Sequence, residues 1–287
     1  MKVVTTIAEV KQIIKAWRTE GLSVGLVPTM GFLHAGHQSL MEKAKAENDR
    51  VIVTIFVNPI QFGPTEDLAS YPRDLENDKK ACQQKDVDLI FCPQASEMYA
   101  PHFSSYVDVT GLTDGLCGKK RPGHFKGVCT VVTKLFNITQ PNRAYFGQKD
   151  AQQLAVIKRM VNDLNFDIEI IGCPIVRETD GLAKSSRNSY LSQSERNAAI
   201  CLYKAITKAQ NMIQQGESSA LNCIKAMQEV IAQEPLAKVD YIEFVDLATL
   251  QPTTILNTDV LCAMAVYIGK TRLIDNFIYY HTNRTFS

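Results

Sequence analysis

The stretch Leu22-Ser-Val-Gly-Leu-Val-Pro-Thr-Met-Gly-Phe-Leu-His-Ala-Gly-His37 decides the fold of this chain. Its first half is an apolar run, which is closed by Pro28-Thr-Met-Gly31. Residues 38–48 follow with apolar side chains at the spacing of one helical face, namely Leu40, Met41 and Ala44. The stretch therefore predicts a strand, a turn and a helix, and it places His34 and His37 in the turn that opens the helix.

This turn has the composition of a phosphate-binding site. The first N–H groups of a helix lack partners within the helix and lie at the positive end of its dipole, which suits an anion. Gly31 and Gly36 allow the backbone to approach a ligand closely, and two imidazoles can donate hydrogen bonds to phosphoryl oxygens as charge develops. The functional interpretation is a nucleotide site for attack at the α-phosphate. The alternative is a pair of surface histidines in a loop.

The composition is that of an ordinary globular protein of 287 residues, 45% of them apolar and 21% charged. A net charge of +1 argues against a nucleic-acid partner. The eight cysteines have neither CxxC nor CxH spacing, so we expect no metal site, no disulfide framework and a reducing compartment. No apolar stretch approaches about 18 residues and no signal sequence is recognisable, so we expect a cytoplasmic protein without a membrane partner.

Strands and helices alternate along the first part of the chain. The expected helices cover residues 7–17, 74–85 and 150–163, and the strands after the first cover 51–57, 87–91, 144–146 and 167–171. This alternation predicts an α/β fold with a Rossmann-like, doubly wound parallel sheet. Ligands of such sheets bind beyond the carboxyl ends of the strands. The turn with His34 and His37 follows one strand, and residues 58–61 and 147–150 follow two others.

The pattern changes after about residue 175. Ser192-Gln-Ser-Glu195 is a capping box that predicts a long helix to about residue 215, and a second helix is expected to end near residue 233. Strands are expected at residues 239–245, 260–266 and 273–278. We therefore predict two domains: residues 1–175 form the Rossmann-like ligand-binding domain, and residues 176–287 form a smaller α+β lid domain.

Three loops carry further polar side chains with two interpretations each. Lys184-Ser-Ser-Arg187 can close over a triphosphate, or it is a solvated basic loop. Lys149 can hold a phosphate while Asp150 contacts a ribose or a metal; Asp150 can alternatively be a helix N-cap, and the two roles are compatible. Residues 121–125 form either a substrate loop or a simple turn.

Together these motifs resemble the pantothenate synthetase family, whose members are also called pantoate–β-alanine ligases. The motifs are Pro28-Thr-Met-Gly31 with His34 and His37, Phe56-Val-Asn-Pro59 with Phe62, Tyr71-Pro-Arg73, Arg121-Pro-Gly-His-Phe125, Phe146-Gly147 with Asp150 and Leu154, Ser185-Ser-Arg-Asn188, and Arg272-Leu-Ile-Asp-Asn276. They are collinear with the family over essentially the whole chain.

The resemblance implies an activity and a set of site residues. Pantoate and β-alanine are condensed while ATP, accompanied by Mg²⁺, is split to AMP and pyrophosphate through a pantoyl adenylate. The implied catalytic residues are His37 as proton donor, His34, Lys149 and Arg187. The implied ATP-binding residues are Met30, Gly31, Phe32, Leu33, His34, Ala35, Gly36, His37, Gly147, Gln148, Lys149, Asp150, Val176, Lys184, Ser185, Ser186 and Arg187. The implied pantoate ligands are Gln61, which also lies near β-alanine, and Gln153, with Asn58, Tyr71, Arg121 and His124 as second-line substrate residues.

One residue departs from the family pattern, and two other functions stay open. Lys184 stands where the family usually has an apolar residue, so it either adds a phosphate contact or points to solvent. A nucleotidyltransferase acting on a phosphate ester would need a second basic pocket, whereas Gln61 and Gln153 suit a hydroxy-carboxylate. A nucleotide-binding regulator without turnover is disfavoured by the complete set of catalytic side chains. The resemblance also implies a homodimer formed through the N-terminal domains.

Overall fold

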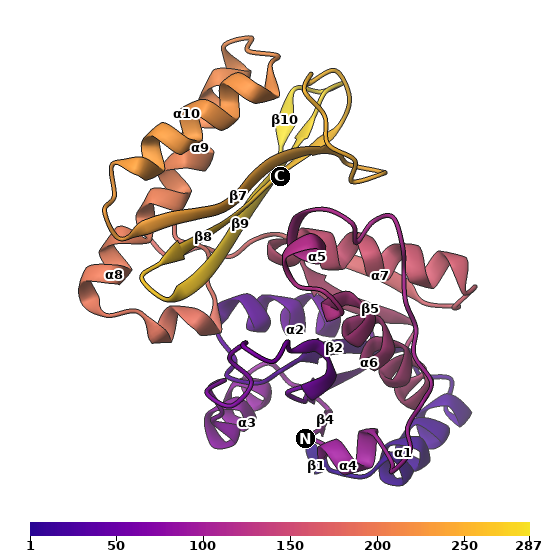
Figure 1. Cartoon of the computed structure of the whole chain (residues 1–287). Coiled ribbons are helices and arrows are strands. Elements are labelled where there is room, and N and C mark those ends of the chain that lie inside the picture. The colour runs from indigo at the N-terminus through magenta and orange to yellow at the C-terminus, as the bar shows by residue number, and fades with distance from the viewer. The chain divides into compact units, whose positions relative to one another are not determined.

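The computed structural model describes residues 1–287, and its packing divides the chain into two units (Figure 1). Unit 1 comprises Met1–Thr110, Arg121–Gln148 and Gln153–Cys173. Unit 2 comprises Gly111–Lys120, Lys149–Gln152 and Pro174–Ser287. A division of the sequence at residue 175 would assign the two short segments of unit 2 to the first domain, whereas their packing places them with the C-terminal residues.

Unit 1 is built on a six-stranded sheet in which every pair of neighbouring strands is parallel. The strand order is β1-β4-β3-β2-β5-β6. The strands are β1 (Lys2–Val4), β2 (Val24–Thr29), β3 (Arg50–Ile55), β4 (Leu89–Phe91), β5 (Arg143–Gly147) and β6 (Glu169–Cys173). Only the three-residue strand β1 was not predicted. Strands β2, β3, β4 and β5 form where apolar runs are buried on both faces of the parallel sheet, whereas the edge strand β6 is only partly buried.

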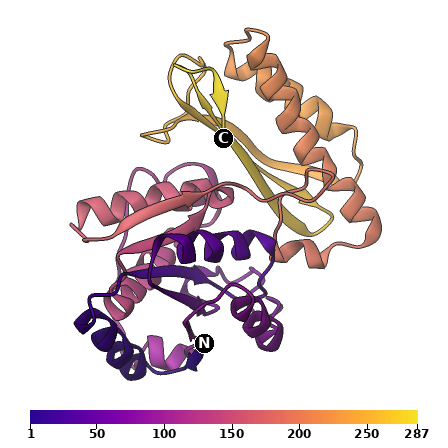
Figure 2. The same cartoon turned by 180° about the vertical axis from the view of Figure 1, so that it is seen from behind.

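Helices cover both faces of this sheet (Figure 1 and Figure 2). The helical segments of unit 1 are α1 (Ile7–Thr19), α2 (Ala35–Glu47), η1 (Pro59–Gln61), α3 (Leu75–Gln83), α4 (Ala95–Met98), α6 (His124–Thr139) and most of α7 (Ala151–Asp163). The short helix η2 (Gln148–Asp150) precedes α7, and two of its residues belong to unit 2. Helices α2 and α3 pack on one face, where Met41 and Cys82 share a core cluster with Val53 of β3. Helix α1 packs against α6. Helix α6 also contacts α7, where the Thr133 hydroxyl lies 3.3 Å from the Met160 sulfur.

Helix α6 was not predicted from the sequence. We considered residues 121–125 as a loop or a turn, but Gly123, with φ of +81°, is the N-cap and His124 already begins the helix. Most of the sixteen residues of α6 are buried, and its less buried side chains are confined to a narrow stripe of Lys126, Thr133, Lys134 and Asn137. The helix is also rich in β-branched side chains, which lower helix propensity. This stripe has helical spacing, so the periodic pattern that predicts a helix is present over residues 126–137.

The order of the strands creates a switch point in the sheet. After β2 the chain proceeds to β3 and β4 on one side, and it later returns to place β5 on the other side of β2. Ligands of open α/β sheets bind beyond the carboxyl ends of the strands at such a point. The carboxyl end of β2 leads directly into the turn with His34 and His37.

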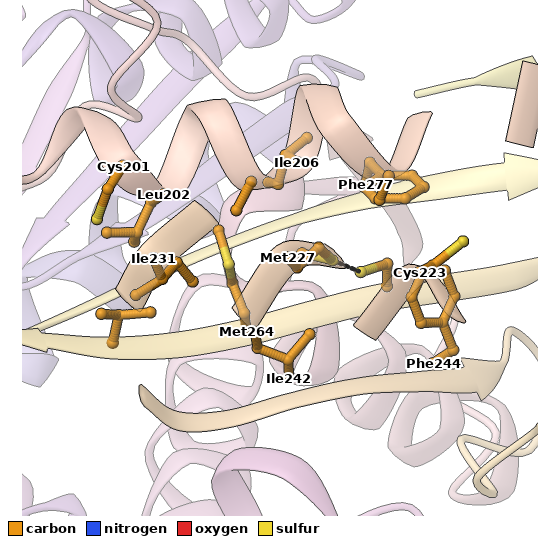
Figure 3. Close-up of a cluster of buried hydrophobic side chains, with 14 of the residues drawn as sticks. Cys201, Leu202, Ile206, Cys223, Met227, Ile231, Ile242, Phe244, Met264 and Phe277 are labelled. Carbon is orange, nitrogen blue, oxygen red and sulfur yellow. Dashed lines mark hydrogen bonds between the residues drawn. The ribbon is translucent and has the colours of Figure 1, made fainter. Parts of the chain in front are cut away.

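Unit 2 contains a four-stranded antiparallel sheet in the order β10-β9-β8-β7. Its strands are β7 (Ala237–Asp246), β8 (Val260–Ile268), β9 (Thr271–Tyr280) and β10 (Thr285–Phe286), and its helices are α5 (Leu116–Lys120), η3 (Ser186–Tyr190), α8 (Gln193–Ala198), α9 (Ile200–Gln214) and α10 (Ala220–Ala232). Figure 3 shows the core between helices and sheet, which contains Leu202 of α9 and Met227 of α10 together with Phe244 of β7 and Met264 of β8. The predicted Rossmann-like fold with a smaller α+β unit is confirmed.

The long helix predicted after Ser192 is wrong in one respect. The capping box between Ser192 and Glu195 is present, but the helix is interrupted at Ala199. The N–H of Leu202 donates to the carbonyl of Ala199, three residues earlier, which is the tighter bonding of a 3₁₀ turn.

None of the helices in the chain is both long enough and apolar enough to cross a membrane.

Candidate active site

The two histidines form a reciprocal cap at the beginning of α2. His34 is the N-cap residue, and its Nδ1 accepts a hydrogen bond of 3.1 Å from the N–H of Gly36. The N–H of His34 in turn donates to Nδ1 of His37 at 3.3 Å. The ring centroids lie 4.0 Å apart. Because each Nδ1 accepts, a neutral imidazole at either position carries its proton on Nε2. The helix N-terminus thus presents two N–H donors of the kind that a phosphate requires.

Asp78 of α3 holds the turn that precedes these histidines. Its carboxylate accepts hydrogen bonds from the N–H of Phe32 at 2.9 Å and from the N–H of Leu33 at 2.7 Å. Burial raises the pKa of this carboxyl above its ordinary value, and the two N–H donors oppose that shift. Phe32 has φ of +52°. A Cβ on Gly31, whose φ is +83°, would lie 2.9 Å from the carboxylate.

Asp78 was not identified from the sequence. The signal available was an acidic residue in a helix about 45 positions after the turn, and no pattern rule connects the two. The structure connects them because α2 and α3 pack on the same face of the sheet. The conformation of residues 31–33 therefore depends on a side chain that local sequence does not reveal.

Three of the predicted residues come together beyond the carboxyl ends of β2 and β3. The side chain of Gln61 accepts from Nδ2 of Asn58 at 2.9 Å and donates to the sulfur of Met30 at 3.4 Å. Tyr99 donates its hydroxyl proton to Oδ1 of Asn58 at 2.7 Å. Asn58 is 1% exposed and Gln61 is 8% exposed, so the amide of Gln61 has a fixed orientation.

Arg121 and His124 lie in the same region of unit 1. Arg121 makes a two-pronged ion pair with Glu66, with both N···O distances at 2.6 Å, and its Nη1 lies 2.9 Å from Nε2 of His124. Nδ1 of His124 lies 2.9 Å from the carbonyl oxygen of Gln61. Burial alone would raise the pKa of Glu66, but the hydrogen bonds and charge of Arg121 prevail and lower it to about 2.

The remaining predicted residues of unit 1 have different surroundings. Tyr71 is buried with its ring 6.0 Å from that of Phe62. Gln153 is half-buried on α7, whereas its neighbour Gln152 is buried and donates to the carbonyls of Leu112 and Gly115. Gly147 ends β5, at the carboxyl edge of the sheet, and Gln148 begins η2.

Unit 2 contains the other predicted residues. The N–H of Lys184 donates to the carbonyl of Val176 at 2.9 Å, so these two predicted residues are neighbours across a turn. The ammonium of Lys184 forms an ion pair with Glu178 at 2.6 Å, a partner that was not predicted from the sequence. Ser185 caps η3 by accepting from the N–H of Arg187, and Ser186 is buried.

Lys149 and Asp150 also pack with unit 2. The carbonyl of Lys149 accepts a hydrogen bond of 2.9 Å from Nδ2 of Asn276 in β9. The preceding residue, Asp275, is 2% exposed and makes a two-pronged ion pair with Arg177 at 2.7 and 3.0 Å. Arg177 forms an isolated bridge with Ala183 in the same turn as Val176 and Lys184. The implied nucleotide residues of unit 2 are thus connected through β9.

The predicted site residues consequently form two sets, each organised within its own unit. The set in unit 1 is Met30, Gly31, Phe32, Leu33, His34, Ala35, Gly36, His37, Asn58, Gln61, Tyr71, Arg121, His124, Gly147, Gln148 and Gln153. The set in unit 2 is Lys149, Asp150, Val176, Lys184, Ser185, Ser186 and Arg187. No group of three or more His, Cys, Asp or Glu side chains is arranged to hold a metal ion.

Comparison with known proteins gives consistent matches over nearly the whole chain. A sequence model of the family described as Pantoate-beta-alanine ligase matches residues 2–278. Pantothenate synthetase of Clostridium botulinum (strain 657 / Type Ba4) is 59% identical over 279 residues, which cover 97% of this chain and 99% of that protein. Pantothenate synthetase of Ruminiclostridium cellulolyticum is 59% identical over 96% of this chain and 98% of that protein.

Two solved structures resemble this one closely. The pantothenate synthetase of Thermus thermophilus matches with a TM-score of 0.90 and 46% identity, covering 96% of this chain and 98% of that one. The pantoate-beta-alanine ligase of Francisella tularensis, complexed with beta-gamma ATP and beta-alanine, matches with a TM-score of 0.81 and 36% identity over 97% of both chains.

Proposed function

Because the chain belongs to the pantoate–β-alanine ligase family and is an ATP-dependent ligase that forms pantothenate, we propose that it does so by the residues of the two sets above. The reaction needs activation, since a carboxylate is a poor acyl donor to an amine. The pantoate carboxylate attacks the α-phosphate of ATP, which forms a pantoyl adenylate and releases pyrophosphate. The amine of β-alanine then attacks the acyl carbon, and AMP leaves.

The observation that carries this proposal is the reciprocal cap of the two histidines. Since Nδ1 of His34 and Nδ1 of His37 accept from main-chain N–H groups, Nε2 of each ring is the proton-bearing nitrogen. Negative charge increases on the phosphate oxygens during the transfer, and fixed donors stabilise it without reorganisation. We assign His37 as proton donor and His34 as its companion on the phosphates, with residues 30–37 forming one wall of the ATP site.

The other residues divide between nucleotide and substrate. Lys149 and Arg187 supply positive charge to the phosphates. The remaining proposed ATP ligands are Gly147, Gln148, Asp150, Val176, Lys184, Ser185 and Ser186. Gln61 and Gln153 hold the hydroxyl and carboxylate groups of pantoate, and Gln61 also lies near β-alanine. The fixed orientation of the Gln61 amide supports this role, because a preset donor and acceptor lose little freedom on binding.

Four further features complete the proposal and rest on the resemblance to the family. Mg²⁺ accompanies ATP and is held mainly by phosphates and water, which is its usual mode of binding. The protein forms a homodimer through its N-terminal domain and acts in the cytoplasm. Residues 1–175 serve as the ATP- and pantoate-binding domain, and residues 176–287 serve as a lid.

The direct test measures pyrophosphate and AMP release from ATP and Mg²⁺. Pantoate alone should produce an enzyme-bound adenylate and one equivalent of pyrophosphate. Addition of β-alanine should start continuous turnover and pantothenate formation. Pyrophosphate release that does not depend on pantoate, from correctly folded protein, would contradict the proposal. The same experiment with a phosphate ester in place of pantoate tests the nucleotidyltransferase alternative.

A further inference from the structure

Gln61 is held from two directions, and only one of them involves its side chain. Asn58 and Met30 bind the amide group. The main-chain carbonyl is bound independently by His124, at 2.9 Å from Nδ1. Gly127 in the next turn of α6 allows this approach, because a Cβ at that position would lie 2.6 Å from Cα of Gln61. The position of Gln61 thus depends on the first turn of α6 as well as on its own loop.

The hydrogen bonds of His124 determine which of its nitrogens carries the proton. A guanidinium group only donates, so Nη1 of Arg121 donates to Nε2 of His124. A carbonyl oxygen only accepts, so Nδ1 of His124 donates to Gln61. His124 is therefore a neutral imidazole with its proton on Nδ1. This is the opposite tautomer from that of His34 and His37.

Glu66 fixes the other end of this chain of contacts. Its carboxylate binds Nε and Nη2 of Arg121 and also accepts from the N–H of Gly63 at 3.1 Å. The side chains of Arg121 and Glu66 are 18% and 23% exposed, so the pair is largely shielded from water. Two-pronged Arg–carboxylate pairs fix the plane of the guanidinium, which here directs Nη1 at His124.

We propose that Glu66, Arg121 and His124 are positioning residues that act on the substrate through Gln61. Glu66 orients Arg121, Arg121 fixes the tautomer of His124, and His124 holds the carbonyl of Gln61. The consequence for catalysis rests on the proposed role of Gln61 as a ligand of pantoate. Neither Arg121 nor His124 needs to contact the substrate for its loss to weaken substrate binding.

The kinetic test compares Glu66→Gln and Arg121→Lys with the double variant. Gln cannot form the two charged bonds, and Lys keeps the charge at position 121 but cannot bind Glu66 and His124 in one plane. Each single variant should raise KM for pantoate about tenfold, the effect of one misplaced hydrogen bond, with KM for ATP unchanged. The double variant should be no worse than the more severe single one, because both break the same chain.

Two kinetic results would overturn the proposal. If Arg121 binds substrate directly, Arg121→Lys should be far more harmful than Glu66→Gln, and the two effects should multiply in the double variant. The matched control is Glu169→Gln, which removes the carboxylate of another Arg–Glu pair of unit 1, between Arg143 and Glu169 at 2.9 Å. It should leave both KM values unchanged. Thermal melting of each variant verifies folding.

A spectroscopic test does not depend on activity. The ¹⁵N spectrum of the imidazoles distinguishes the two tautomers, and the chain has only five histidines to assign. His124 should show its proton on Nδ1 in the wild type and lose this preference in Arg121→Lys. A wild-type His124 with its proton on Nε2 overturns the positioning chain. A wild type that has the Nδ1 tautomer but makes no pantothenate instead overturns the proposed function.

Discussion

At the scale of single residues, each histidine of the turn has one ring nitrogen with a structural role and one to which we assign a role in catalysis. Nδ1 of each ring completes the cap of α2, and we propose that Nε2 donates to the phosphate. On this proposal, the same ring stabilises the helix and supplies a donor to the reaction. A useful substitution should preserve the first role and remove the second.

His37→Asn meets that requirement. The Asn side chain keeps an acceptor near the position of Nδ1, so the N–H of His34 retains its partner, but the Nε2 donor is lost. We expect adenylate formation to slow by about 10²–10³-fold, the usual effect of removing one preorganised donor, with little change in melting temperature. Single-turnover pyrophosphate release measures the rate. His281→Asn, at an exposed position, is the control, and near-normal turnover of His37→Asn would exclude Nε2 from the chemistry.

Glu66 predicts a specific dependence of stability on pH. Its pKa is about 2 in the folded chain against an ordinary value of 4.5, so the ionised form is favoured by folding. This contribution is complete above about pH 4.5 and is lost as the pH falls toward 2. The difference in unfolding free energy between wild type and Glu66→Gln should therefore shrink as the pH is lowered from about 6 to about 3. Urea titrations at each pH measure it, and a difference that stays constant over that range would contradict the assigned ion pair.

At the scale of elements, the approach of α6 to η1 determines where Gln61 lies. The backbone of Gly127 is so close to Gln61 that any side chain at position 127 must displace one of the two segments. An alanine normally favours a helix over glycine by about 1 kcal/mol. Here the strain of overpacking, typically about 1–3 kcal/mol, should exceed that gain.

Gly127→Ala should accordingly lower the free energy of unfolding and raise KM for pantoate. Gly115→Ala is the matched control, because a Cβ at position 115 would meet no atom closer than 4.0 Å and the φ angle there is not positive. Chemical denaturation and steady-state kinetics on both variants provide the comparison. A Gly127→Ala protein that is more stable than wild type and has unchanged KM would show that the two segments separate easily.

At the scale of the whole molecule, the sequence was sufficient to predict the parallel sheet and the turn with His34 and His37. Both arise from local patterns, namely buried apolar runs and a strand followed by an amphipathic helix. The turn at residues 121–123 and the many β-branched side chains obscured α6, although Lys126, Thr133, Lys134 and Asn137 form a narrow polar stripe at helical spacing. The sequence could not reveal Asp78 or Glu66, whose partners are 45 or more positions away and meet them only through packing.

The hydrogen bond from Asn276 to the carbonyl of Lys149 has a consequence for synthesis of the chain. Domains form from the N-terminus onward as the polypeptide leaves the ribosome, and the sheet of unit 1 is complete at Cys173. The segment 149–152 packs with unit 2, whose strand β9 is translated more than a hundred residues later. A nascent chain thus assembles its parallel sheet and its pair of histidines long before this lysine acquires its final support. The last strands to be translated complete the surroundings of a residue made at mid-chain.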